Sequence, residues 1–308
     1  MKDGGSSSFE DYLRAALIEP APEAAMHVAR ALAEKHSGAA IFLYGSGISL
    51  SAAEDPTAIL YDFYVIAPNY ADAIGNRLER IAARLIPPNV YYFETMSPIG
   101  LLRSKYALLS AAHFERLVSE RTFHSYFWAR FAQPSRLVVR PVELERRMIA
   151  GVRTAIETFL QRVRPLAEDP RDWRDIWLTG LNASYRAELR AEKSDRAEKL
   201  VDHYGDWPRI TAGSALDDKA VSVRGAALAW RLRAVLGAFL SIARLLKATA
   251  TFKGGLDYIA WKVERHAGVD VGVKPWERRH PFIAAPIVAL RYYRLRAAAR
   301  RAIGNEKA

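Results

Sequence analysis

The chain contains no cysteine among its 308 residues. That absence excludes a disulfide framework, a thiolate nucleophile and a zinc site with cysteine ligands. Long apolar runs are missing as well: no uninterrupted run approaches the ~20 residues that cross a bilayer. The longest candidate, residues 281–290, contains Pro286, and the polar residues 1–8 have no apolar segment like that of a signal peptide. We therefore expect no transmembrane segment, which leaves open a peripheral position on a membrane.

Several common catalytic motifs are also absent. The seven histidines show no spacing typical of a zinc site, so we expect His113 and His124 to be helix-surface or core residues. No Gly-x-Ser-x-Gly elbow is present. Serine-hydrolase and zinc-dependent chemistry are therefore not indicated.

What the chain does have is apolar residues and positive charge. Hydrophobic residues make up 50% of it, enough for a sizeable core, and the formal net charge is +11. Such an excess of positive charge favours an anionic partner: a nucleic acid, an acidic membrane surface or a phosphorylated substrate. Charge alone does not choose among them.

Hydrophobic periodicity predicts an α/β (α+β) domain followed by helices. A soft boundary lies near Pro141, where the composition becomes nearly all helical. We expect a first domain at 1–140, a mainly helical domain at 141–270 and a C-terminal tail at 271–308. The predicted strands are 39–44, 58–67, 89–94 and 136–140; the predicted helices are 9–19, 22–36, 70–85, 142–163, 173–199 and 220–248, with a loop at 202–215.

The motif that carries chemistry is Tyr44-Gly45-Ser46-Gly47 at the end of a predicted strand, followed by Asp62 within the next strand. Glycines let the backbone approach phosphates closely, and backbone N–H groups with a serine hydroxyl can hold a triphosphate. A strand-borne aspartate can hold Mg²⁺. The alternatives are a plain tight turn for the glycines and a salt-bridged structural role for Asp62, because a carboxylate among apolar residues needs a partner.

Together the turn and Asp62 resemble the polymerase-beta-like nucleotidyltransferase fold. That superfamily usually carries two acids spaced i, i+2 on this strand, and here the second position is Tyr64. Both side chains should project from the same face of the strand. The site therefore lacks one expected metal ligand.

Downstream residues sharpen the resemblance. Lys105-Tyr106 stands within Ser104-Lys105-Tyr106-Ala107, and Arg130 precedes Phe131-Ala132-Gln133-Pro134. In this order the motifs resemble the translocator assembly and maintenance family, the mitochondrial-type phosphatidate cytidylyltransferases. The match is clearest over about residues 40–135. Ala107 and Ala129 stand where the family has glycine, and Gln133 where it has lysine, which puts a phosphate contact by Gln133 in doubt.

The resemblance implies transfer of CMP from CTP to phosphatidate, with Mg²⁺ as cofactor and CDP-diacylglycerol and pyrophosphate as products. It also implies site residues. Catalytic roles fall to Asp62, Lys105 and Arg130; nucleotide binding to Tyr44, Gly45, Ser46, Gly47 and Tyr106; and metal binding to Asp62 and Glu94. Glu54 and Asp55 are further possible ligands, for which a solvated loop is the simpler interpretation. A phosphate acceptor is already ionised near neutral pH, so one acid can be dispensed with.

The C-terminal tail reads as a basic amphipathic helix suited to an anionic lipid interface. Apolar and basic residues fall on different helical faces, with tyrosines suited to the headgroup level. The residues expected at the membrane are Arg291, Tyr292, Arg294, Leu295 and Arg301. We expect a peripheral protein on the cytoplasmic face of a membrane. A terminal helix packed on the domain is the alternative.

Two other functions stay open. One is a nucleotidyltransferase acting on RNA or a small molecule, although no aromatic-rich basic strand like that of an RNA-binding module is present and nucleic acid is not the expected partner. The other is a catalytically inert membrane adaptor with a degenerate nucleotidyltransferase domain. Tyr64, Ala107 and Gln133 favour the adaptor.

Overall fold

The computed structural model describes residues 4–48, 54–188, 196–215, 225–251 and 274–279, together with Arg291. Its centre is a five-stranded mixed sheet of order β3-β4-β2-β1-β5. Only the β2–β4 pair is parallel among these strands. The strands are β1 (Ala40–Tyr44), β2 (Leu60–Ala67), β3 (Asn89–Ser97), β4 (Gly100–Ser110) and β5 (Ser135–Val139). The predicted mixed α/β class is confirmed.

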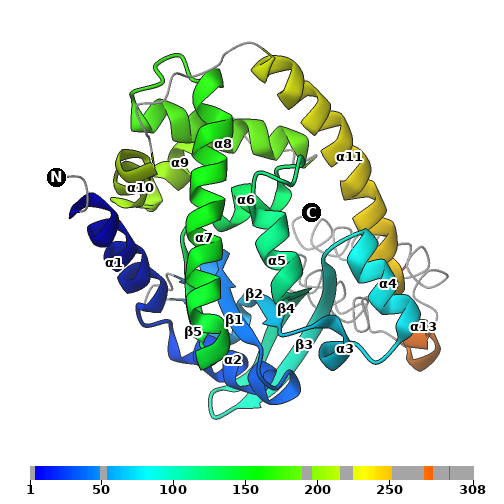
Figure 1. Cartoon of the computed structure of the whole chain (residues 1–308). Coiled ribbons are helices and arrows are strands. Elements are labelled where there is room, and N and C mark those ends of the chain that lie inside the picture. Colours follow the sequence, from blue (N-terminus) through cyan, green and yellow to red (C-terminus); the bar gives the residue numbers. More distant parts are fainter. Residues whose placement is uncertain are drawn as a thin grey trace, which may run out of the picture.

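Helices cover both faces of the sheet (Figure 1). Because side chains alternate along a strand, Leu43 and Phe63 point to one face and Phe42 and Tyr64 to the other. The Leu43 face packs against α2 (Glu23–Lys35), α3 (Tyr70–Ala73) and α4 (Arg77–Leu85). The Phe42 face packs against α5 (Ala111–Val118), α6 (Tyr126–Phe131) and α7 (Val142–Val163).

The remaining helices extend the core on the Phe42 face. One buried cluster joins Phe42 and Tyr64 of the sheet to Phe159, Trp177 and Trp230 of the helices. The core is therefore continuous across residue 141, and the domain boundary there stays a prediction from composition. These helices are α1 (Gly4–Ile18), α8 (Trp173–Ala187), α9 (Arg196–His203), α10 (Trp207–Ala215) and α11 (Ala226–Thr251), with the short α13 (Pro275–Arg279) further on.

Most predicted elements are confirmed, α7 among them with the predicted bounds. The single helix predicted at 70–85 is instead two helices, because Asn69 and Asn76 each cap a new helix start. The loop predicted at 202–215 is wrong over its second part, where α10 forms. Pro208 lies in the first turn of that helix, a position that tolerates proline. Short 3₁₀ turns complete the chain at η1 (Gly45–Ile48), η2 (Pro56–Ala58) and η3 (Arg164–Leu166).

The strand β4 was not predicted, yet it lies between β3 and β2 in the sheet. Its first half carries Arg103, Ser104 and Lys105, which interrupt the apolar alternation that predicts a strand. Pairing on both sides holds these residues in place. The polar stretch on β4 positions the candidate site described next.

Candidate functional site

The site begins at the glycine turn that ends β1. Gly45 has φ +75°, in the left-handed region that favours glycine. A Cβ added there would lie 3.5 Å from Oδ2 of Asp62, and one on Gly47 would lie 3.1 Å from the Tyr61 ring. The glycines therefore let the turn lie directly against Asp62. The Ser46 side chain is outside the described part of the chain, so its role stays a prediction.

Asp62 lies opposite Tyr44 on β1 and opposite Lys105 on β4. Its Oδ1 and the Nζ of Lys105 are 3.0 Å apart, with side-chain exposures of 22% and 38%. Two of the three predicted catalytic residues, Asp62 and Lys105, thus meet beside the glycine turn, whereas Arg130 pairs with Glu188 instead. This ion pair is also what the alternative interpretation, a structural role for a salt-bridged Asp62, predicts.

Tyr64 shares the face of Asp62, as predicted, but its side chain is 1% exposed and belongs to the core. Its ring centroid lies 4.9 Å from that of Tyr44 and 4.7 Å from that of Phe131. Burial, followed by the nearby Tyr126 and Tyr44, holds the pKa of Tyr64 well above its ordinary value. Because Tyr64 is buried in the core, it does not replace the second acid that the superfamily usually carries on this strand.

Glu94 also lies on this face, but β4 separates it from Asp62. Its carboxylate is 3.4 Å from Nε of Arg103 and accepts a 2.6 Å hydrogen bond from Tyr92. Strands two places apart lie roughly 10 Å apart, so the structure does not bring together the two predicted metal ligands. Within the described ranges, no group of three or more histidine, aspartate or glutamate side chains could hold a metal. Asp62, which lies against the glycine turn, is the predicted ligand closest to that turn.

The two loop carboxylates are accounted for differently. Asp55 caps η2 by accepting hydrogen bonds from the backbone and hydroxyl of Thr57, at 2.9 and 2.8 Å. Glu54 is exposed. The simpler interpretation of these two residues fits the structure.

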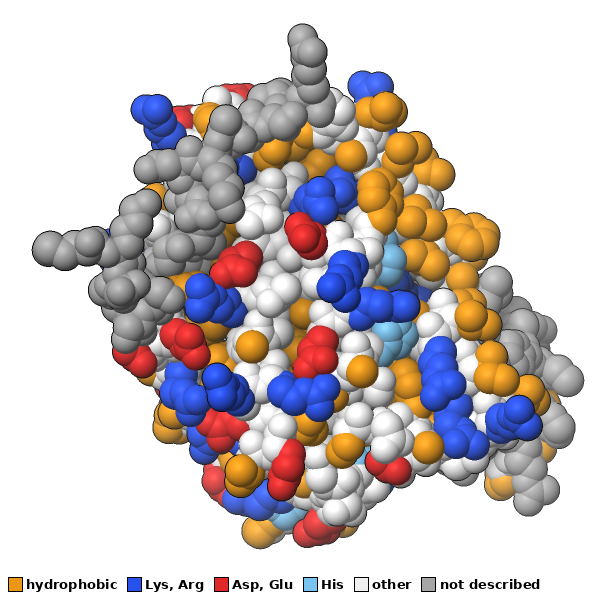
Figure 2. Space-filling view, in the orientation of Figure 1, with side chains coloured by type: hydrophobic (Ala, Val, Ile, Leu, Met, Phe, Trp, Pro, Cys, Tyr) orange, Lys and Arg blue, Asp and Glu red, His pale blue; other side chains and the backbone are white. Residues whose placement is uncertain are grey.

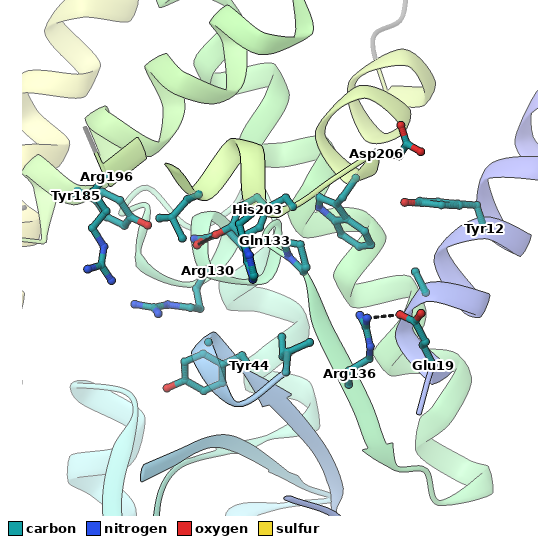
Figure 3. A pocket seen from close by; sticks show the side chains of 17 residues that line it. Tyr12, Glu19, Tyr44, Arg130, Gln133, Arg136, Tyr185, Arg196, His203 and Asp206 are labelled. Atoms are coloured by element: carbon teal, nitrogen blue, oxygen red, sulfur yellow. Dashed lines mark hydrogen bonds and ion pairs between the residues drawn. The ribbon is translucent and has the colours of Figure 1, made fainter. Parts of the chain in front are cut away.

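A cavity of about 410 Å³ adjoins the glycine turn, and neither Asp62 nor Lys105 is among the residues that line it. Tyr44 and Gly45 line it together with Arg130, Arg136 and Arg196. In Figure 3, Arg130 and Arg196 lie on the side of Tyr44, whereas Glu19 and Asp206 lie on the side of Tyr12. The wall nearest the turn is therefore cationic, which suits a phosphate group.

Arg130 is the most buried of the cationic residues in that wall. Its guanidinium carbon lies 5.4 Å from the Tyr44 ring centroid, and Nη2 lies 3.5 Å from Oε2 of Glu188. Burial by itself would lower the pKa of Arg130, but the Glu188 carboxylate holds that pKa well above its ordinary value. Arg130 is therefore a fixed positive charge at the cavity wall.

Two residues of the sequence motifs, Tyr106 and Gln133, already form hydrogen bonds within the protein. Tyr106 points to the opposite face of the sheet from Lys105, is 2% exposed and shares a 3.1 Å hydrogen bond with His36. Because successive strand residues alternate between faces, Tyr106 lies away from Asp62 and Lys105, and its nucleotide binding stays a prediction. Gln133 lines the cavity, but its amide already binds the carbonyl of Ala129 at 2.8 Å and the hydroxyl of Tyr204 at 2.7 Å.

Sequence reasoning missed the part of the cavity that comes from α8 and α9. Tyr185, Arg196 and His203 line the cavity with Arg130 because these helices pack over the end of the sheet, and Glu188, directly after α8, pairs with Arg130. Nothing local marks them, since they are ordinary residues of charged helices. Only their tertiary position shows that they line the cavity.

The tail predictions fall almost wholly outside the described residues: Tyr292, Arg294, Leu295 and Arg301 are not among them. Arg291 is described, and it forms an ion pair with Glu277, whose side chain is fully buried. Arg291 is thus engaged with the protein itself. Among the described residues, one helix segment, Ala226–Arg244 of α11, is apolar and long enough to span a membrane, with a mean hydropathy of 1.5 and 11% of it buried.

This apolar segment escapes a reading of uninterrupted runs, because Arg231 and Arg233 break the run in the sequence while the segment as a whole is apolar. One such helix is weak support for a membrane span, so the part of the chain that the structure describes shows no clear transmembrane character.

The chain matches no protein-family model and none of the curated protein sequences. The family resemblance therefore depends on the motif residues and on the geometry around them.

Proposed function

We propose that the chain is a nucleotidyltransferase that transfers CMP from CTP to phosphatidate and so forms CDP-diacylglycerol. The single observation that carries this proposal is the contact between the glycine turn and Asp62, 3.5 Å from a Cβ built on Gly45. A backbone turn lying against a strand carboxylate brings together a phosphate-binding group and a group that can hold Mg²⁺. The strand pattern, with β1 antiparallel to β2 and β4 parallel to β2, is compatible with the polymerase-beta-like fold.

Each residue then has a defined task. The turn at Gly45 and Gly47 lets phosphate oxygens approach backbone N–H groups. Lys105 neutralises Asp62 in the free protein, and its 38% exposed side chain is free to turn toward a phosphate when one binds. Arg130 keeps its charge at the cavity wall and can bind a second phosphate there. A bound Mg²⁺ would be held by Asp62 and by phosphate oxygens, and would neutralise charge on the triphosphate.

The reaction needs no general base from the protein. A phosphate oxygen of phosphatidate forms a bond to the α-phosphorus of CTP, and the bond from that phosphorus to pyrophosphate breaks. The attacking oxygen is already ionised near neutral pH, so no proton has to be removed. Catalysis consists of positioning and charge stabilisation, which fits a site with one strand carboxylate and several cations.

The proposed location is the cytoplasmic face of a membrane, with the protein peripheral, because phosphatidate resides in the bilayer. The direct test is to incubate the pure protein with labelled CTP, Mg²⁺ and phosphatidate vesicles and to measure CDP-diacylglycerol and pyrophosphate. Equimolar formation of both supports the proposal. Formation of neither under saturating CTP would refute it.

An inert membrane adaptor is the second candidate. It is favoured by one observation: Asp62 is already paired with Lys105, as a purely structural carboxylate would be. The melting temperature in the presence of CTP and Mg²⁺ distinguishes the two. The enzyme should be stabilised by its ligand, and the adaptor should not respond. Stabilisation by another nucleotide with RNA as acceptor would instead indicate the RNA-directed enzyme.

A further inference from the structure

The helix α11 turns the polar groups of Trp230, Arg233, Arg244 and Lys247 toward the protein and a row of large apolar side chains outward. Near its start, Trp230 is 6% exposed and Arg233 is 4% exposed. Nε1 of Trp230 donates to the carbonyl of Arg162 at 2.8 Å, and Nε of Arg233 donates to the carbonyl of Phe123 at 2.9 Å. These side chains fasten the first half of α11 to the domain.

The second half is fastened in the same way. Nε of Arg244 donates to the carbonyl of Pro87 at 2.7 Å, and Nζ of Lys247 donates to the carbonyl of Pro88 at 2.7 Å and to Oδ1 of Asn89 at 2.8 Å. Between the two halves, a Cβ added to Gly237 would lie 2.3 Å from the carbonyl oxygen of Ala187. The inner face of α11 is therefore a continuous line of hydrogen-bond donors and close backbone contact.

The outer face is apolar and open. Five large apolar side chains recur every three or four residues along α11, which places them on one side of the helix. They are Leu228 at 60%, Leu232 at 53%, Val235 at 71%, Phe239 at 68% and Ile242 at 53% exposure. Figure 2 shows apolar side chains gathered along the edge that α11 forms in Figure 1. A patch of this kind marks an interaction site in a protein with a separate core.

The apolar surface continues at the far end of α11. There Lys247 also donates to the carbonyl of Ile86, directly after α4. The exposed apolar side chains of α4 are Leu78 at 76%, Ile81 at 44% and Leu85 at 72%. Two neighbouring helices thus present unpartnered apolar residues, and together we call them the α11–α4 face.

The charge around this face selects the partner. The exposed cations beside this face are Arg231 on α11 and Arg77 and Arg84 on α4, while the other three basic residues of α11 bond to the protein. We propose that the α11–α4 face docks on an anionic phospholipid bilayer, with its apolar side chains in the interfacial region and these exposed arginines near the headgroups. A second copy of this chain fits less well, because a symmetric dimer would bring the same cationic surfaces together.

The docking is peripheral rather than membrane-spanning. Crossing the bilayer would require Arg233, Arg244 and Lys247 to leave their carbonyl partners and enter hydrocarbon, where charged side chains are strongly disfavoured. Lying on the surface keeps those hydrogen bonds. The proposal does not rest on the proposed reaction, because lipid binding is measured without CTP.

The test is flotation of the full chain with two kinds of vesicle: phosphatidylcholine alone, and phosphatidylcholine mixed with phosphatidylserine. We expect binding to the anionic vesicles that weakens with salt. The triple variant Leu232→Ser, Val235→Ser, Phe239→Ser should lose at least about tenfold in binding. The matched control is Met96→Ser, Ile99→Ser, Val142→Ser, which removes apolar side chains that are 69%, 58% and 88% exposed elsewhere. The control should bind as the unaltered protein does.

Two measurements keep the outcomes separate. Thermal unfolding checks that both triple variants are folded, which we expect because all six positions are exposed. Sedimentation equilibrium shows whether the chain self-associates. Unchanged vesicle binding by the α11 variant overturns the proposal. So does a dimer that depends on α11 in a protein that does not bind vesicles. Loss of CDP-diacylglycerol formation with intact vesicle binding would count against the reaction and leave the docking face standing.

Discussion

Oδ1 of Asp62 and Nζ of Lys105 lie 3.0 Å apart across the parallel pair of β2 and β4. Both side chains are partly exposed, so solvent screens the attraction and the pair contributes little to folding, on the order of 0–1 kcal/mol. The two residues lie beside the glycine turn and share the face of the core tyrosine Tyr64. The pair contributes little to the free energy of unfolding but lies where a ligand is expected. Mutation of the pair should therefore change activity without unfolding the protein.

Asp62→Asn should lower CDP-diacylglycerol formation by about 100-fold or more, because the amide cannot hold Mg²⁺ as a carboxylate does. The free energy of unfolding should change by less than about 1 kcal/mol. Steady-state turnover and urea unfolding measure the two effects. Glu94→Gln is the matched control, since Glu94 pairs with Arg103 on the same face and should keep most of the turnover. Normal turnover by Asp62→Asn would remove this carboxylate from the mechanism, and an equal loss in Glu94→Gln would place Glu94 in the site.

Gly45→Ala should weaken CTP binding and lower stability by about 1–2 kcal/mol, the cost of a left-handed backbone for a residue with a Cβ. The strain arises because Gly45 has φ +75°, and the added methyl would also lie beside Asp62. Gly75→Ala provides the comparison, because a Cβ at Gly75 meets nothing within 4 Å. Isothermal titration with CTP and Mg²⁺, together with melting curves, tests both variants. Equal effects at the two glycines would show that the turn has no special role.

The sequence predicted the ends of β1 and β2 well because their residues are uniformly apolar up to the site. The hydrophobic pattern alone predicts strands at 39–44 and 58–67, close to the observed β1 and β2. The contact of Gly45 with Asp62 follows from the pairing of these two strands. Local pattern therefore sufficed for the part of the site that lies on adjacent strands. It failed for β4, whose polar first half becomes a strand only through partners on both sides.

The rest of the site depends on contacts between distant parts of the chain. Glu188 reaches Arg130 because α8 packs over α6, and no spacing in the sequence encodes that contact. The side of the sheet on which Tyr106 lies could have been read from alternation with Lys105, since the two are neighbours on one strand. The sequence predicted a helix with one basic side in the region of α11. It did not show that most of these basic residues face the protein and that the apolar side faces outward.

Acid should destabilise the protein between about pH 6.5 and pH 4, on the basis of three histidines. Burial, followed by the nearby charge of Lys35, lowers the pKa of His36 to about 4; burial and nearby basic residues, including Arg116, do the same for His113 and His124. The unfolded chain, with an ordinary pKa of about 6.5, takes up these protons first as the pH falls. Stability is therefore full above about pH 6.5 and is lost progressively toward pH 4.

The size of this effect should be about 1–3 kcal/mol per histidine. Urea unfolding at a series of pH values measures it. His36→Gln should flatten the slope, because the variant removes one of the protons taken up on unfolding. His27→Gln, which changes a histidine bound to the backbone of Met96, should be compared at each pH. A pH profile of unfolding that is identical in His36→Gln and the unaltered protein would contradict the assignment.

Glu188 and Arg130 can be tested by a double-mutant cycle. Their side chains are only 7% and 15% exposed, so each single change leaves the other charge buried without its partner. Arg130→Met and Glu188→Gln should each lower the free energy of unfolding by about 3 kcal/mol, and the double variant should recover much of that loss. Urea unfolding of the four proteins gives the coupling energy.

Binding of CTP with Mg²⁺ should divide the same variants differently. Arg130→Met and the double variant should both bind CTP at least about tenfold more weakly, because the cavity wall beside Tyr44 loses its most buried cation in both. Glu188→Gln keeps the guanidinium and should bind CTP as well as the unaltered protein or better. Stability and affinity would then follow separate patterns across one set of proteins. Arg130 would be a structural residue alone if the double variant, restored in stability, also bound CTP normally.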